Sequence, residues 1–334
     1  MSETVDDTVN DTINDSQEPK YVPFHTPVLL NEVLENLAPE EESSLFIDGT
    51  TGEGGHAFAI LSRWTKLNYW ALDADERIQA KAKVRLASFG DRVKFHLGWF
   101  DEFFENYPGD RKPDRILLDL GISMFHYEGS GRGFSFRLAE SLDMRLNPEE
   151  GQSAADLVNR LEEKDLADLI YKYGEERLSR RIARAVVLRR KEKNFVNADD
   201  LAQVIYSCVP AEVRRMRIHP ATKTFQALRI AVNHELDRLE AVIPAAFKQL
   251  KVGGALGIIT FHSLEDRIVK NIFRDLASRC VCPKEQMRCN CGGVALAKVT
   301  KAIGPTDEES RENPPSRSAK LRVAIKIRED RKSE

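Results

Sequence analysis

The sequence is poor in cysteine, with five among 334 residues, and it contains no apolar run of the roughly 18 residues that a membrane-spanning helix needs. Five cysteines do not form the disulfide framework typical of small secreted proteins. The first residues also lack the basic segment and apolar run of a secretory signal. Apolar residues make up 42% and charged residues 31%, a balance typical of folded soluble proteins. We therefore expect a cytoplasmic protein of one or two domains.

Positive charge is missing from residues 1–19, which carry six acidic side chains and no basic one. This polar, acidic segment predicts a disordered tail over residues 1–20. Residues 177–229 show the opposite bias, with 13 Lys and Arg against 4 Asp and Glu. Such a basic block in a nearly neutral chain indicates a polyanionic partner, although charge alone does not identify a function.

Short apolar runs alternate with longer amphipathic stretches, such as Glu76–Phe89, through the first part of the chain. This alternation predicts an α/β fold with a mostly parallel sheet covered by helices on both faces. A further strand is expected over residues 321–327, lying antiparallel at one side of the sheet, because apolar residues alternate there. The runs that predict the parallel strands are residues 45–48, 69–73, 93–97, 116–120 and 255–260.

The alternation stops near Tyr127. Three glycines and two phenylalanines between Gly129 and Phe136 predict a flexible loop, either a linker or a segment that closes over a substrate. From Ser153 to about Leu239 the pattern is helical, and Ser153 with Asp156 has the spacing of a capping box. We therefore expect a helical domain inserted between two strands of the sheet.

A glycine-rich segment, residues 48–56, lies between an expected strand and an expected helix. Asp73 ends the next strand, 21 residues after Gly52, where a nucleoside site commonly places a carboxylate for ribose hydroxyls. Residues 52–57 also fit the G-x-G-x-x-A dinucleotide fingerprint. The segment alone therefore allows a nicotinamide cofactor, S-adenosylmethionine, or a turn that binds nothing.

Seven motifs in a fixed order resemble one family, the bacterial small-subunit ribosomal RNA cytosine-N(4)-methyltransferases (MraW/RsmH family). The resemblance runs from about His25 to Ile327. The motifs are His25–Leu30 (HTPVLL), Asp48–His56 (DGT and GGH), Leu118–Gly121 (LDLG), Gly133–Phe136 (GFSF), Leu142–Arg145 (LDMR), Phe261–Asp266 (FHSLED), and Glu312–Pro314 (ENP) with Arg317–Arg322 (RSAKLR).

The resemblance implies a class I, Rossmann-like methyltransferase that uses S-adenosylmethionine to methylate a cytosine in the decoding region of small-subunit ribosomal RNA. The chain departs from the family after Leu118–Gly121, because residues 123–126 read Ser-Met-Phe-His where Ser-Ser-Pro-Gln is usual. The cofactor contacts carried over by motif are Gly54, Gly55, His56, Asp73, Phe100, Asp119 and His126.

The expected domains follow from these patterns. Residues 21–128 and 240–334 form the methyltransferase domain, and residues 129–239 form the inserted helical domain that recognises RNA. Within that insertion, a helix places Arg177, Arg180, Arg181, Arg184 and Lys191 on one side. The alternative is an ordinary solvated charged helix.

Asp119 is the candidate catalytic residue. It follows a strand at the edge of the sheet where open α/β folds bind ligands, and its carboxylate can accept the hydrogens of a cytosine amine. The alternatives are a cofactor contact and a turn cap. His262 follows the next strand and is as well explained by an ordinary loop histidine.

Methyl transfer to nitrogen requires no cysteine nucleophile. Cys280, Cys282, Cys289 and Cys291 form two C-x-C pairs, a spacing tighter than the customary zinc pattern. We expect reduced surface cysteines and no metal ligand, with a structural zinc site or a redox pair as alternatives. Cys208 is expected in the core.

Two other functions fit parts of the sequence. A nicotinamide-dependent oxidoreductase is favoured only by the fingerprint at residues 52–57. The second is a non-catalytic RNA-binding or assembly factor on a methyltransferase scaffold. The presence of Gly54, Gly55, Asp73 and Asp119 argues against it, because a degenerate site need not keep these residues.

Overall fold

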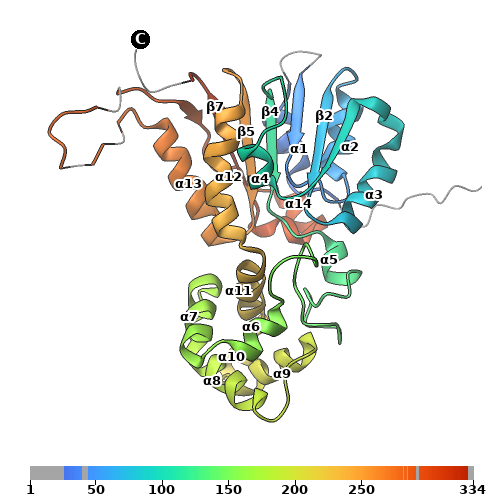
Figure 1. Cartoon of the computed structure of the whole chain (residues 1–334), viewed down its shortest axis with the longest axis vertical. Helices are drawn as coiled ribbons and strands as arrows, with labels where there is room; N and C mark the ends of the chain where they lie inside the picture. Colours follow the sequence, from blue (N-terminus) through green and yellow to red (C-terminus); the bar gives the residue numbers. More distant parts are fainter. Residues whose placement is uncertain (1–25, 40–43, 281, 284, 291–292, 330–334) are drawn as a thin grey trace, which may run out of the picture.

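The computed structural model describes residues 26–39, 44–280, 282–283, 285–290 and 293–329. The predicted acidic tail, residues 1–20, lies outside the described residues. Figure 1 shows a sheet with its helices above a separate group of helices. None of the helices described has the length and apolar character required to cross a membrane.

The described residues form one seven-stranded sheet in the order β3-β2-β1-β4-β5-β7-β6. The first five strands of the chain pair in parallel, and β7 pairs antiparallel with both β5 and β6. The predicted mostly parallel sheet with an antiparallel C-terminal strand is confirmed, whereas the edge strand β6 was not predicted. The strands are β1 Leu45–Asp48, β2 Asn68–Asp73, β3 Val93–Leu97, β4 Arg115–Asp119, β5 Ala255–Thr260, β6 Ala297–Val299 and β7 Lys320–Lys326.

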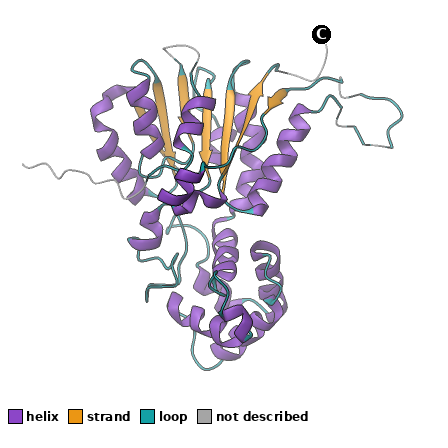
Figure 2. Cartoon of the chain, turned by 180° about the vertical axis from the view of Figure 1, so that it is seen from behind, coloured by secondary structure: helices purple, strands orange, loops and turns teal. Residues whose placement is uncertain are grey.

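Helices cover both faces of this sheet (Figure 2). Because successive side chains of a strand point to opposite faces, Phe46 of β1 packs in one apolar core while Leu45 and Ile47 pack in the other. The core around Phe46 includes helices α1 (Leu30–Asn36), α2 (Gly55–Arg63) and α3 (Glu76–Leu86), and the other includes α4 (Phe100–Glu105), α12 (Glu235–Gln249) and α13 (Ser263–Ala277).

The helices α6 to α11, inserted between β4 and α12, have a hydrophobic core of their own, which includes residues from Phe134 to Val232. The Ser153–Asp156 capping box at the start of α6 is confirmed. Shorter elements complete the chain: α5 Met124–Glu128, η1 Ala87–Arg92, α14 Asp307–Glu312 and η2 Pro314–Ser318. The inserted helices are α6 Ala154–Arg160, α7 Glu163–Gly174, α8 Ser179–Arg190, α9 Ala198–Cys208, α10 Ala211–Arg214 and α11 Thr222–Asn233.

The Gly129–Phe136 segment is a loop, as predicted, and its aromatic rings pack against the inserted helices. Phe134 is buried in the core of the insertion, and Phe136 stacks on His219 with ring centroids 4.6 Å apart. Arg132 of the same loop is also buried. The glycines of the loop permit the backbone turns that direct it inward. Burial of the aromatic side chains in the core is favourable because it removes apolar surface from water. The ring of Phe134 is therefore not exposed to a ligand, and the half-buried ring of Phe136 is already stacked on His219.

Candidate functional site

The predicted site residues gather at the carboxyl ends of the parallel strands. The strand order reverses between β1 and β4, which lie side by side in the sheet. In open α/β sheets, a crevice for ligands opens at this switch point. Asp48 ends β1 and Asp119 ends β4. Asp119 lines the crevice, whereas the Asp48 carboxylate is buried and accepts a hydrogen bond of 2.9 Å from the hydroxyl of Tyr69.

The glycine-rich turn after β1 is held in place by Asp73 at the end of β2. Gly52 has a φ of 56°, in the left-handed region, and its N–H donates to Oδ2 of Asp73 at 2.8 Å. Oδ1 of Asp73 accepts a hydrogen bond of 2.9 Å from the N–H of Asp75. Each oxygen keeps a further lone pair for a ligand. Burial raises the pKa of the Asp73 carboxyl above its ordinary value.

Two cavities meet at this turn. The smaller, about 110 Å³, is lined by Asp73, Phe100 and His126, and the larger, about 340 Å³, is lined by Gly55 and His56. Gly54 lines neither cavity. Gly54 is the N-cap residue of α2, with a φ of 77° in the left-handed region, and its N–H donates to the carbonyl of Thr51. The residues that line both cavities are Thr50, Gly52, Asp119, Leu120, Gly121, Ile122 and Ser123.

Asp119 lies between the two cavities and has an unusual electrostatic setting. Its Oδ1 accepts a hydrogen bond of 3.0 Å from the N–H of Gly121. Burial raises the pKa of Asp119 to about 7, and the carboxylates of Asp48 and Glu265 add to the rise. A carboxyl group with this pKa exchanges a proton near neutral pH. The predicted positions of Asp73 and Asp119 in one crevice are therefore found in the structure.

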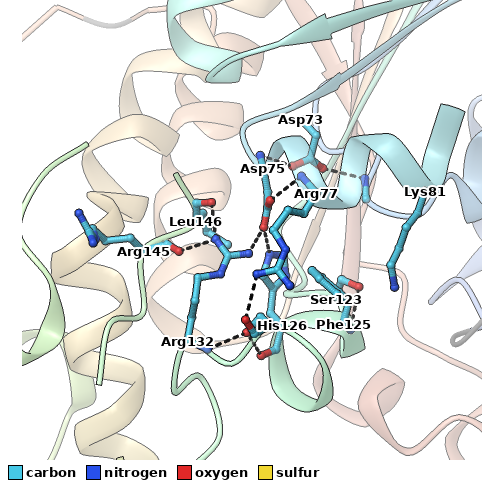
Figure 3. A network of polar contacts seen from close by, with 12 residues as sticks. Asp73, Asp75, Arg77, Lys81, Ser123, Phe125, His126, Arg132, Arg145 and Leu146 are labelled. Atoms are coloured by element: carbon cyan, nitrogen blue, oxygen red, sulfur yellow. Dashed lines mark hydrogen bonds and ion pairs between the residues drawn. The ribbon is translucent and has the colours of Figure 1, made fainter. Parts of the chain in front are cut away.

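His126 belongs to a buried network centred on Asp75, at the start of α3. Figure 3 shows the Asp75 carboxylate between the side chains of His126 and Arg132. Burial opposes the charge on Asp75, but the hydrogen bonds from His126 and Arg132 outweigh it and lower the pKa to about 2. Nε2 of His126, 2.9 Å from Oδ2 of Asp75, therefore faces an ionised acceptor and carries a hydrogen.

The other ring nitrogen of His126 is left for a ligand. Nδ1 is buried and has no hydrogen-bond partner among the described residues, although His126 lines the smaller cavity. In the neutral ring Nδ1 is an acceptor, and a buried acceptor without a partner costs free energy. Residues 123–126 differ from the family motif, but His126 still places a polar ring nitrogen at the predicted cofactor contact.

Arg229 and Glu235 were not singled out by the sequence. Arg229 of α11 donates to both carboxylate oxygens of Glu235, at 2.8 and 2.9 Å, and lines the larger cavity. Burial opposes its charge, but Glu235 raises the pKa of Arg229 further above its usual range. Neither residue belongs to a local motif. The sequence therefore did not predict that they pair across the turn between α11 and α12.

Arg238 of α12 was missed for the same reason. Its guanidinium lies 3.9 Å from the ring centroid of Trp99 and donates to Asp101 at 2.8 Å. Trp99 and Arg238 both line the smaller cavity. This contact joins the start of α4 to α12 and so fixes the wall that carries Phe100.

His262 begins α13. Its Nε2 lies 2.9 Å from Oε1 of Glu265, and its Nδ1 accepts from the N–H of the same residue at 3.4 Å. The ring lines the larger cavity, but its polar atoms are directed at Glu265. The structure therefore supports a helix-capping role for His262.

The basic helix α8 has the predicted two-sided character. Ile182, Ala183 and Val186 are buried in the core of the insertion. Arg189, which interrupts the apolar face in sequence, pairs with Asp200 at 2.8 Å. The side chains that remain exposed are Arg177, Arg180, Arg181, Arg184 and Lys191.

Known proteins resemble this chain over most of its length. Residues 23–327 match the model of the MraW methylase family. The chain is 60% identical over 308 residues to the Ribosomal RNA small subunit methyltransferase H of Treponema denticola, covering 91% of this chain and 98% of that protein. It is 46% identical to the protein of the same name from Syntrophobacter fumaroxidans, covering 90% and 96%.

Solved structures are more distant. An rRNA methylase from Streptococcus thermophilus aligns over 90% of this chain and 94% of that chain, with 11% identity and a TM-score of 0.38. The assignment therefore depends on the family model and the sequence relatives. On that basis, the chain belongs to the MraW methylase family.

Proposed function

We propose that this protein transfers a methyl group from S-adenosylmethionine to the exocyclic N(4) amine of a cytosine in the decoding region of small-subunit ribosomal RNA. The relatives named small-subunit ribosomal RNA methyltransferases support the reaction class and the RNA. The cytosine and its position come from the motif resemblance. The observation that carries the proposal is that Asp119 lines both cavities of the crevice.

The smaller cavity is the cofactor site in this proposal. S-adenosylmethionine supplies a methyl group on a positively charged sulfur, which makes the methyl carbon electrophilic. Asp73 accepts hydrogen bonds from the ribose hydroxyls, and Nδ1 of His126 accepts one from a further donor of the cofactor. Phe100 provides an apolar wall beside them. Gly54 permits the tight turn, while Gly55 and His56 line the neighbouring cavity.

The larger cavity receives the cytosine. The lone pair of its amine is delocalised into the ring, so an acceptor on the amine hydrogens is needed to direct the nitrogen at the methyl group. Asp119 provides that acceptor from the wall shared by both cavities, and positioning the two reactants lowers the barrier. With a pKa of about 7, its carboxylate can also take the proton that the amine loses.

The insertion, residues 129–239, binds the RNA in this proposal. Its five exposed cations, three on α8 and one close to each end of that helix, attract phosphates. A groove of about 1010 Å³ runs from the residues just before α8 to the start of α13. Its charged lining residues are Lys172, Arg177, Lys223 and Arg267, with Glu176 and with Glu175, which pairs with Arg267. Because α13 begins beside the larger cavity, at His262, the groove offers a route for a strand toward the crevice.

Nucleoside mass analysis of small-subunit RNA tests the proposal. RNA from cells that lack the protein should lose one N(4)-methylcytidine signal, and the purified protein with labelled S-adenosylmethionine should restore it. Binding of NAD in place of S-adenosylmethionine would favour an oxidoreductase. RNA binding without transfer of label would favour an assembly factor.

A further inference from the structure

The segment that joins α13 to β6, residues 278–296, has no described helix or strand. Its base is fixed, because the N–H of Leu296 donates to the carbonyl of Leu276 at 2.8 Å and the N–H of Ile327 donates to the carbonyl of Leu296 at 2.8 Å. Loops longer than about 12–15 residues without secondary structure are uncommon in compact domains. The segment beyond this base therefore needs another source of order.

Three cysteine side chains meet in this loop. Sγ of Cys289 lies 3.7 Å from Sγ of Cys280 and 3.8 Å from Sγ of Cys282. All three sulfur atoms lie within 4.8 Å of one another. Cys280 and Cys289 are exposed and Cys282 is half-buried, so burial of apolar surface does not explain why the three thiols converge.

The distances match a shared metal ion. In a tetrahedral zinc site with Zn–S bonds of about 2.3 Å, neighbouring sulfur atoms are about 3.8 Å apart. We propose that the thiolates of Cys280, Cys282 and Cys289 bind one Zn²⁺ ion. The C-x-C spacing is shorter than usual, but the structure brings both cysteines of the first pair to Cys289. Cys291 lies outside the described residues, and the proposal depends on the three described thiols.

The surroundings fit a thiolate-bound cation. Binding releases one proton from each thiol to solvent, and Zn²⁺ with three thiolates carries one negative charge. Arg279 and Arg288 are the residues that directly precede Cys280 and Cys289 in the sequence. Oδ1 of Asn290 lies 3.3 Å from Sγ of Cys282. A disulfide joins two sulfurs at about 2.05 Å and leaves the third thiol unexplained, whereas one metal ion engages all three.

The site has a structural role because of its place in the fold. α13 begins near the crevice at Ser263 and ends at Ala277, so its 15 residues span about 22 Å along the helix axis. The cysteines follow that distant end. In Figure 1 the loop extends from the sheet on the side away from the inserted helices. The ion would therefore fix the loop and take no part in the chemistry of the crevice.

Metal analysis of the full chain tests the proposal. The protein is purified without metal-affinity resin and compared with the C280S/C282S/C289S variant. The control is C208S, which removes a half-buried thiol in α9, outside the loop. We expect about one zinc ion per chain in the wild type and in C208S, and less than about a tenth of that in the triple variant.

A metal titration tests the same site if zinc is lost during purification or if the triple variant folds poorly. The reduced, metal-free wild type is titrated with Zn²⁺ against a chromophoric chelator, and with Co²⁺, whose absorption reports tetrahedral thiolate ligands. Zinc binding tighter than about 1 μM with the cobalt spectrum supports the site. Binding weaker than about 1 mM, iron with the colour of an iron–sulfur cluster, or a Cys280–Cys289 disulfide in the protein isolated from cells would overturn it.

Discussion

Nδ1 of His56 lies 3.6 Å from Oδ2 of Asp119, while Nε2 of the same ring lies 3.0 Å from the carbonyl oxygen of Val28. A carbonyl oxygen only accepts hydrogen bonds, so Nε2 carries a hydrogen; when the ring is neutral, Nδ1 is then an acceptor that faces Asp119. A proton on Asp119 thus has a second acceptor nearby. In the proposed reaction, this arrangement suits a carboxylate that receives the proton of the amine.

The first prediction concerns pH and the charge of the cofactor. Asp119 is protonated below its pKa of about 7 and ionised above it. A positively charged sulfur beside it favours the ionised form, so affinity for S-adenosylmethionine should rise with pH up to about 7, by at most about tenfold per pH unit, and then level off. S-adenosylhomocysteine, whose sulfur is neutral, should show a weaker rise.

Calorimetry between about pH 5.5 and 8.5 measures this difference. Asp119→Asn removes the titrating group and should make the two pH profiles parallel. Identical profiles for both ligands in the wild type would contradict a charge interaction between Asp119 and the methyl-bearing sulfur.

The second prediction concerns Asp73. Asp73→Ala should weaken S-adenosylmethionine binding by on the order of 2–3 kcal/mol, because a charged acceptor for the ribose hydroxyls is lost. The structure adds a second reason, since the Gly52 and Asp75 N–H groups also lose their acceptor. Asp91→Ala, at an exposed position before β3, is the matched control. Unchanged affinity in folded Asp73→Ala would show that Asp73 is not the ribose ligand.

The sequence predicted those parts of the molecule that local patterns encode. Short apolar runs predicted the five parallel strands. The glycine-rich turn at residues 48–56, together with Asp73, predicted one wall of the crevice. The pairing of Arg229 with Glu235 and the stacking of Arg238 on Trp99 depend on how α11, α12 and α4 pack, and no local pattern records that packing. The Gly129–Phe136 loop was predicted by composition alone, which cannot tell an exposed aromatic ring from one that a neighbouring core receives.

The third prediction concerns RNA binding. Replacing Arg177, Arg180, Arg181 and Arg184 with Gln should weaken RNA binding and reduce the salt dependence by up to about four counterions' worth of slope. Affinity for S-adenosylmethionine should be unchanged, because none of the four lines either crevice cavity.

The control for that variant removes the same charge elsewhere. Arg63, Lys83, Arg274 and Lys298 are exposed on the sheet domain, away from α8, and their replacement with Gln should leave the salt slope near the wild-type value. Equal slopes for the α8 variant and the wild type would mean that this helix does not face RNA.

The fourth prediction concerns the role of Asp119 in the chemical step. Asp119→Asn keeps the size of the side chain but replaces a charged acceptor with an amide whose NH₂ group can face the donors of the base. An interaction that strengthens as nitrogen attacks affects mainly kcat, and a loss of roughly 10²–10³-fold is expected for one preorganised electrostatic group. If Asp119 only held the cofactor, the loss would disappear at saturating S-adenosylmethionine.

Single-turnover methylation with bound RNA and excess S-adenosylmethionine distinguishes these two roles of Asp119. Asp114→Asn is the matched control, since Asp114 is a buried carboxylate at the opposite end of β4, where it accepts a hydrogen bond of 2.7 Å from the N–H of Leu45. That variant should lose stability, seen as a lower Tm, and keep the single-turnover rate of the folded protein. A near-wild-type rate for Asp119→Asn would remove its carboxylate from the chemistry. The carbonyl groups of Leu120 and Gly121, which line both cavities, would then be the acceptors for the amine.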